Sequence, residues 1–196
     1  MAACRAAAPL AALLLTVAAA FWPLAAAAQE PEAGAPARDT DFTFTLSKVI
    51  GQPGFEVSVP VLFGRKAGTR NVGSLRARIS YPAAALKFNR IEDAYLSRRV
   101  KLEVKATESS ADPATSALLM EFRLPDPQGT QFPSGHIATL YFNIAEGAAD
   151  QVIHLNPAVW IDDVQVKEND PQTLIEVGEV RIAKDPVMVG CFFFSH

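Results

Sequence analysis

The sequence predicts an all-β protein, a sandwich or jelly roll of about nine short strands. Apolar and polar side chains alternate with a period of two in stretches such as 42–46, 55–61 and 75–81. This alternation is typical of strands with one buried face. Turn-rich stretches separate the alternating runs every 8 to 15 residues or so, a spacing that favours a sandwich. Only residues 93–99 have the pattern of a helical turn.

The expected strands follow one another along the chain with turns between them. The first two are 41–50 and 55–63, and Pro60 in the second indicates a strand edge or a bulge, because proline cannot donate a ladder hydrogen bond. The third strand, 72–81, ends at Pro82, whose fixed φ turns the chain into a short fourth strand. The remaining apolar runs are 99–106, 117–124, 136–144, 151–156, 158–162 and 173–182.

The two ends of the chain differ in composition from the segment between them. Residues 1–28 have a positively charged start, an apolar core and a small-residue cleavage site, the three parts of a secretory signal. A membrane anchor is the alternative, but the run is rich in alanine and broken by Pro23. Residues 29–40 form a flexible leader, 41–184 the sandwich domain and 185–196 an apolar tail. The signal predicts a secreted, cell-surface or periplasmic bacterial protein with no membrane span after cleavage.

Charge and cysteine content limit the classes of partner and of stabilising bond. The chain has 18 Lys and Arg, 21 Asp and Glu and a formal net charge of −3. Such a mildly acidic, mixed surface argues against nucleic acid or an anionic membrane as the partner. Cys4 lies within the signal, so Cys191 in the tail is the one thiol of the expected mature protein. Cys191 is therefore a free thiol that can pair only between molecules, and the fold has to rest on its hydrophobic core.

The order and spacing of four segments resemble the cohesin module. The segments are IGQPGFEVSVPVLF, VGSLRARISYPAAALKFNRIE, SGHIATLYFNIAEGAADQVIHL and VWIDDVQVKENDPQTLIEVGEVRIA, and the match covers 41–184. The resemblance implies a nine-stranded jelly-roll sandwich that acts as a non-catalytic protein-binding module, with a calcium-loaded dockerin as its usual ligand. In the family an aspartate stands between the tyrosine and the proline after the third strand, whereas here Tyr81 is followed directly by Pro82.

The resemblance also implies a flat binding face, on which the third, fifth, sixth and eighth strands of the family receive the dockerin helices. The outward residues of the corresponding runs carry mixed charge, and arginine is enriched where proteins bind one another. The alternative is that these side chains only supply the polar outer face that an antiparallel sheet needs. The candidate partner-binding residues are Arg76, Arg78, Lys101, Glu103, Lys105, Glu121, Arg123 and His154.

Three other classes of function compete with protein docking. An enzyme is not expected, because the sequence has no serine in a nucleophile elbow, no zinc-spacing cluster and no glycine-rich phosphate loop. A carbohydrate-binding module of the same fold would present a row of aromatic rings, and Trp160, Tyr81, Tyr95 and Tyr141 are too sparse for such a row. A structural component of an envelope or extracellular matrix is the third alternative.

Acidic residues gather in the segment 160–172 and raise the question of a calcium site. Calcium takes about six to eight oxygen ligands, and Asp162 and Asp163 are the candidates to supply them. The spacing does not follow the EF-hand loop, and a solvated acidic turn is the alternative. We expect no cofactor.

Overall fold

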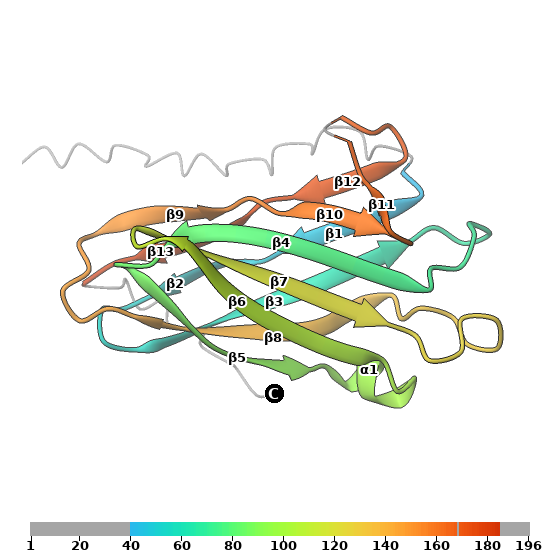
Figure 1. Ribbon diagram of the computed structural model, residues 1–196, viewed down its shortest axis with the longest axis horizontal. Coiled ribbons are helices and arrows are strands. Elements are labelled where there is room, and N and C mark those ends of the chain that lie inside the picture. The colour runs from blue at the N-terminus through green and yellow to red at the C-terminus, as the bar shows by residue number, and fades with distance from the viewer. Residues whose placement is uncertain (1–39, 168, 185–196) are drawn as a thin grey trace, which may run out of the picture. The chain divides into compact units, whose positions relative to one another are not determined.

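The computed structural model describes residues 40–167 and 169–184, and this part of the chain is nearly all β-structure (Figure 1). It contains two five-stranded sheets and one three-stranded sheet. The β3 sheet has the order β12 (Thr173–Glu176), β1 (Phe42–Leu46), β3 (Glu56–Arg65), β8 (Gly135–Ile144) and β5 (Leu86–Asp93).

The other two sheets are named in the same way. The β4 sheet has the order β11 (Val164–Gln165), β10 (Ala158–Ile161), β4 (Ser74–Pro82), β7 (Thr115–Arg123) and β6 (Glu103–Asp112). The β13 sheet has the order β2 (Lys48–Gly51), β13 (Gly178–Ile182) and β9 (Gln151–Leu155). One short helix, α1 (Tyr95–Arg99), lies between β5 and β6 in the chain.

The β3 and β4 sheets form the two layers of a sandwich. In Figure 1 the strands β4, β7 and β6 lie in front of β1, β3 and β8, and α1 stands where the chain passes from one layer to the other. The alternation in the sequence matches these layers, because Leu75, Ala77, Ile79 and Tyr81 of β4 are buried between them. The all-β prediction and the helical turn near residues 93–99 are both confirmed.

Aromatic side chains from both layers meet in the core. Phe142 of β8 is fully buried. Its ring lies 5.1 Å from the Tyr81 ring of the facing sheet and 5.9 Å from the Phe88 ring of the neighbouring strand, both edge to face. Edge-to-face pairs add to the stabilisation that burial already supplies. Phe142 therefore joins the two sheets at the centre of the sandwich.

The expected strands are more divided than the sequence indicated. The run 41–50 becomes β1 and β2, which are separated by Ser47, and the run 173–182 becomes β12 and β13, which are separated by Val177. Each division lets the first part pair within the β3 sheet and the second part pair within the β13 sheet. A single expected strand thus serves two sheets, which alternation alone could not reveal.

Of the two positions that the sequence indicated for Pro60, a strand edge or a bulge, the structure shows one beside a bulge. Pro60 lies in β3, which has β1 on one side and β8 on the other. Ladder pairing with β1 stops at Leu46 opposite Val61, and the backbone N–H of Ser47 donates to the Pro60 carbonyl at 3.0 Å. The register with β8 also shifts just after Val61. Because β1 ends and a bulge begins beside it, the proline can lie inside the sheet without a donor.

Candidate functional site

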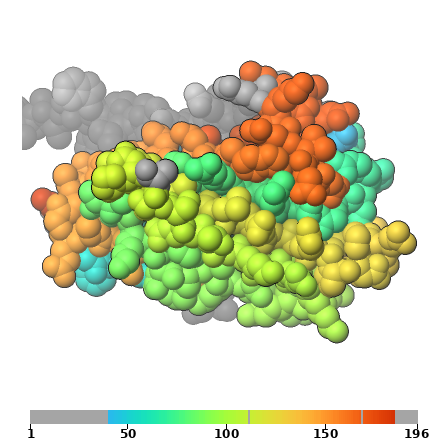
Figure 2. All heavy atoms as spheres, in the orientation of Figure 1, coloured from blue at the N-terminus to red at the C-terminus, as the bar shows by residue number. Residues whose placement is uncertain are grey.

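The outer side of the β4 sheet carries most of the predicted binding residues. Strand register places side chains of β10, β4, β7 and β6 in rows across this side. Figure 2 shows the surface, with β6 and β7 in yellow-green and yellow and the β10–β11 region in orange. We call it the arginine face, and its residues are Ala158, Trp160, Arg76, Arg78, Ser80, Ala117, Leu119, Glu121, Arg123, Glu103, Lys105, Thr107 and Ser109.

One half of the arginine face has mixed charge. Arg76 lies between Trp160 and Glu121 in the register, and its guanidinium carbon lies 5.8 Å from the centroid of the Trp160 ring. Its Nη2 also pairs with the Asp163 carboxylate at 3.0 Å. A hollow of about 190 Å³ opens beside Arg76, and it is lined by Ser74, Arg76, Glu103, Lys105, Glu121, Phe122, Arg123 and Asp163.

The other half of the arginine face is low in relief and has one charge. Arg78 is exposed and lies between Ala158 and Leu119 in the register. The next row has small side chains only, Ser80 beside Ala117. Within residues 40–167 and 169–184, Arg78 has neither an ion pair nor a side-chain hydrogen bond. This half therefore presents a single unpaired guanidinium among small and apolar side chains.

Six of the eight predicted binding residues share the arginine face, and two do not. The six are Arg76, Arg78, Glu103, Lys105, Glu121 and Arg123. Lys101 precedes β6 in a turn after α1 and has a φ of 55°, so it is not an outward residue of a strand. His154 lies on β9 opposite Glu179, in the β13 sheet, and is not in the sheet that contains Arg76.

On the opposite outer face, that of the β3 sheet, three charged side chains pair with one another, while Lys87 has no ion pair within the described residues. Arg90 of β5 donates to Glu56 at 2.5 Å and to Glu92 at 2.8 Å. The same guanidinium lies 3.8 Å from the centroid of the Tyr141 ring, and the Tyr141 hydroxyl donates to Glu92 at 3.1 Å. Asn89 completes the cluster with a bond to Glu56 at 2.6 Å. Arg90 thus joins Glu56 and Glu92 in one network.

The electrostatics of the Arg90 network follow from these contacts. Hydrogen bonds from Arg90 and Asn89 lower the pKa of Glu56, and those from Arg90 and Tyr141 lower the pKa of Glu92. Donation to Glu92 raises the pKa of Tyr141, because the phenol has a partner that stabilises its protonated form. Both carboxylates therefore stay ionised and bound to Arg90, so a partner would have to break these contacts in order to bind them.

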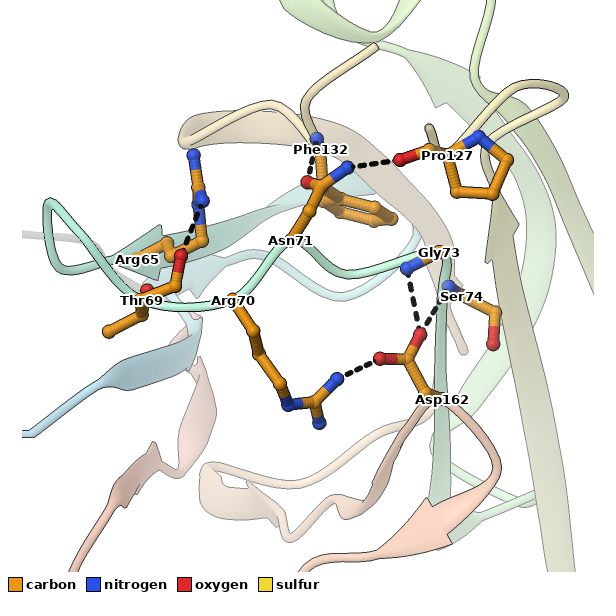
Figure 3. Close-up of polar contacts among 9 residues, drawn as sticks. All are labelled: Arg65, Thr69, Arg70, Asn71, Gly73, Ser74, Pro127, Phe132 and Asp162. Atoms are coloured by element: carbon orange, nitrogen blue, oxygen red, sulfur yellow. Dashed lines mark hydrogen bonds and ion pairs between the residues drawn. The ribbon is translucent and has the colours of Figure 1, made fainter. Parts of the chain in front are cut away.

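At one end of the sandwich, Asp162 fixes the turn between β10 and β11 to the start of β4 (Figure 3). Its Oδ1 accepts hydrogen bonds from the backbone N–H groups of Gly73 at 2.7 Å and Ser74 at 3.0 Å. Its Oδ2 pairs with the guanidinium of Arg70. Burial acts to raise the pKa of Asp162, but the bonds from Ser74, Arg70 and Gly73 outweigh it and hold the pKa below its usual value.

The two calcium candidates have other partners in the structure. Asp162 is bound to Arg70 and to two backbone N–H groups, and Asp163 is paired with Arg76. In the described part of the chain, no group of three or more His, Cys, Asp or Glu side chains is arranged to hold a metal ion. These carboxylates thus anchor a turn and orient an arginine, and the calcium interpretation of them is not supported.

Asn71 holds the neighbouring loop in place and was not singled out in the sequence. Its amide nitrogen donates to the carbonyls of Pro127 at 2.7 Å and Thr130 at 2.8 Å, and its oxygen accepts from the Phe132 N–H at 2.9 Å. Figure 3 shows this side chain between the β3–β4 loop and the β7–β8 loop. The asparagine lies in a polar turn, GRKAGTRN, so no pattern in the sequence distinguished it from a solvent-exposed residue.

The aromatic side chains do not form a sugar-stacking row. Tyr81 is buried in the core, and Tyr95 lies on α1, where 67% of its surface is exposed. Arg90 covers the Tyr141 ring, while Arg76 lies over Trp160. No two of these rings make a ring-to-ring contact in the described residues. This arrangement does not favour the carbohydrate-binding alternative.

The predictions for the two ends concern residues that the structure does not describe. The signal segment 1–28, most of the leader 29–40 and the tail with Cys191 lie outside the described residues. No helix in the described residues is long and apolar enough to cross a membrane.

Comparisons with known proteins find similar proteins among solved structures but not by sequence. No protein-family model matches the sequence. No curated protein matches it either. Among solved structures, the chain resembles a type I cohesin–dockerin complex from Clostridium thermocellum, with a TM-score of 0.56 and 13% identity over 74% of this chain and 100% of that chain.

Two further matches come from other organisms. The seventh ScaB type I cohesin from Pseudobacteroides cellulosolvens has a TM-score of 0.53 and 15% identity over 78% of this chain and 98% of that chain. A non-cellulosomal cohesin from the archaeon Archaeoglobus fulgidus has a TM-score of 0.50 and 16% identity over 74% of this chain and 92% of that chain. The sheets described above thus have a cohesin-like jelly-roll fold.

Proposed function

We propose that this chain is a non-catalytic protein-docking module, which holds another protein on the arginine face. The observation that carries the proposal is the difference between the two outer faces. Around Arg90 the charges of the β3 sheet are paired with one another. On the arginine face Arg78, Lys105 and Arg123 have no ion pair within the described residues. Free charges on a rigid sheet can bind a partner without first breaking internal contacts or ordering a loop.

The fold supports the same function by analogy. The cohesin structures that this chain resembles include complexes with dockerins. A dockerin-type protein that carries calcium is therefore the first partner to test, and another protein on the same face is the second. We further propose that the module acts outside the cytoplasm, secreted or at the cell surface, because residues 1–28 have the pattern of an export signal.

A bulky side chain at Ser80 is expected to weaken docking. Ser80 is exposed in the low-relief half of the arginine face, where a tyrosine ring would hold a partner away without altering any charge. We expect the Ser80→Tyr variant to capture at least about tenfold less partner, because the ring would prevent close packing on this row and well-packed contacts carry most of the affinity of an interface. The measurement is affinity capture from secreted and envelope fractions of the source organism, with calcium and with a chelator.

The matched control is Ser58→Tyr. Ser58 is also an exposed serine in a long strand, but it lies on the β3 sheet opposite Tyr141. A partner captured equally by the wild type and Ser58→Tyr, and lost by Ser80→Tyr, supports the proposal. Equal capture by Ser80→Tyr would place docking elsewhere. If the chelator abolishes capture, the partner needs calcium to bind. If capture is the same with calcium and with chelator, the partner binds independently of calcium.

A further inference from the structure

We infer that the partner presents a carboxylate to Arg78. This inference rests on the proposed function, because it names the chemistry that the arginine face selects. Arg78 is the charged residue of the low-relief half, and its neighbours in the register are Leu119 and Ala158. A guanidinium beside apolar side chains binds an anion more strongly than one surrounded by water, since less solvent screens the pair.

The other arginine of β4 is already occupied. Arg76 pairs with Asp163 and lies over Trp160, so its charge is largely balanced within the chain. Glu121 faces Arg76 in the register and lies one row away from Arg78, but it makes no ion pair with either arginine. Arg78 is therefore the arginine of β4 whose guanidinium is free to donate two parallel hydrogen bonds to a partner.

The surroundings of Arg78 favour a carboxylate over a phosphate. A phosphate carries close to two negative charges, and sites that bind it usually combine several cations or backbone N–H groups. Here the backbone of β4 pairs with β7 and β10, and no second cation stands in the row of Arg78, whose other members are Ala158, Leu119 and Thr107. One free guanidinium matches the charge and the planar geometry of one carboxylate.

The small side chains next to Arg78 define how the partner approaches. Ser80 and Ala117 fill the adjacent row, and Ser109 continues it on β6. No large side chain rises from this row, so the partner's backbone can lie close to the sheet while its acidic side chain reaches Arg78. An aspartate or glutamate flanked by small or apolar residues is the complementary surface.

The test uses a displayed library of helical peptides, randomised at surface positions with equal shares of acidic and basic residues. Binders are selected on the full chain, and those that lose binding to Ser80→Tyr are kept. We expect these face-dependent binders to be enriched in Asp and Glu. Changing the enriched Glu to Gln in a binder should weaken it at least about tenfold on the wild type, the range for a charged hydrogen-bonded pair.

The assignment to Arg78 comes from pairing the peptide and protein variants. On Arg78→Glu the same Glu-to-Gln change should no longer weaken binding, and on Arg78→Lys it should weaken binding by an intermediate factor, because lysine keeps the charge but loses the fork. Arg181→Glu is the matched control. Arg181 is also an exposed strand arginine between two apolar neighbours, Ile50 and Val152, but it lies in the β13 sheet. The charge reversal at Arg181 should leave the peptide affinities unchanged.

Each contrary result has a distinct meaning. If the binders that depend on the arginine face are not enriched in Asp and Glu, the inference is overturned. It is also overturned if the Glu-to-Gln change weakens binding equally on the wild type and on Arg78→Glu. In both cases the docking face itself stands. A library that yields no binder sensitive to Ser80→Tyr would count against the arginine face itself, and so against the proposed function together with the inference.

Discussion

The Asp162→Ala variant is expected to lose about 2–3 kcal/mol of unfolding free energy, because hydrogen bonds to a charged group are among the strong ones. The substitution removes the acceptor for the Gly73 and Ser74 N–H groups and the partner of Arg70. Chemical denaturation measures the loss. The start of β4, and with it the position of Arg76, should loosen before the rest of the sandwich.

Asp163→Ala is the matched control for this change. Both aspartates have positive φ, 48° and 65°, so alanine suffers similar backbone strain at each. Asp163 also pairs with an arginine, but its side chain is 70% exposed. An exposed ion pair contributes at most about 1 kcal/mol. Equal losses in the two variants would show that backbone strain, and not the Asp162 carboxylate, accounts for the effect.

The contribution of Asp162 to the free energy of unfolding should also depend on pH. Its pKa in the folded protein lies below its usual value, so the ionised side chain stabilises the fold above the ordinary carboxyl pKa of about 4. That contribution is lost as the pH falls through the folded-state pKa. The stability difference between the wild type and Asp162→Asn should therefore be full near neutral pH and shrink in acid. A difference that stays constant down to low pH would contradict this account.

The Phe142→Ala variant is expected to lose about 3–5 kcal/mol, the usual cost of removing a buried phenylalanine ring. Phe142 is fully buried and contacts rings from both sheets, so its loss leaves a cavity that the rigid strands cannot close. The shift in denaturation midpoint measures this effect. Phe55→Ala is the control, because 64% of Phe55 is exposed, and a comparable loss there would mean that the core is not centred on Phe142.

The sequence indicated which side of each main strand faces the core. Alternation in 75–81 placed Leu75 and Tyr81 inside and Arg76 and Arg78 outside, and the structure confirms this. The reason is physical: successive side chains of a strand point to opposite faces, so burial of one set determines the direction of the other. The layers, and most of the arginine face, could therefore be predicted from the residues and the family resemblance.

What the sequence could not show is which strand pairs with which, and where a strand changes sheets. His154 was placed beside Arg76 because the run 151–156 was taken as the family's eighth strand, but this run forms β9, which pairs with β13, and the next run forms β10, which pairs with β4. Lys101 alternates correctly with its neighbours, yet the end of α1 places it in a turn. The roles of Asp162 and Asn71 depend on loops that are distant in the sequence and meet only in the fold.

The central claim is that a partner protein lies on the arginine face. The most direct test is hydroxyl-radical footprinting of the full chain with and without the partner recovered by capture, read by mass spectrometry. We predict that binding protects Trp160 and Leu119, which lie on the arginine face, and leaves Tyr141 and Phe55 as reactive as before. Protection of Tyr141 or Phe55, with Trp160 and Leu119 unchanged, would contradict the account and place the docking surface on another part of the sandwich.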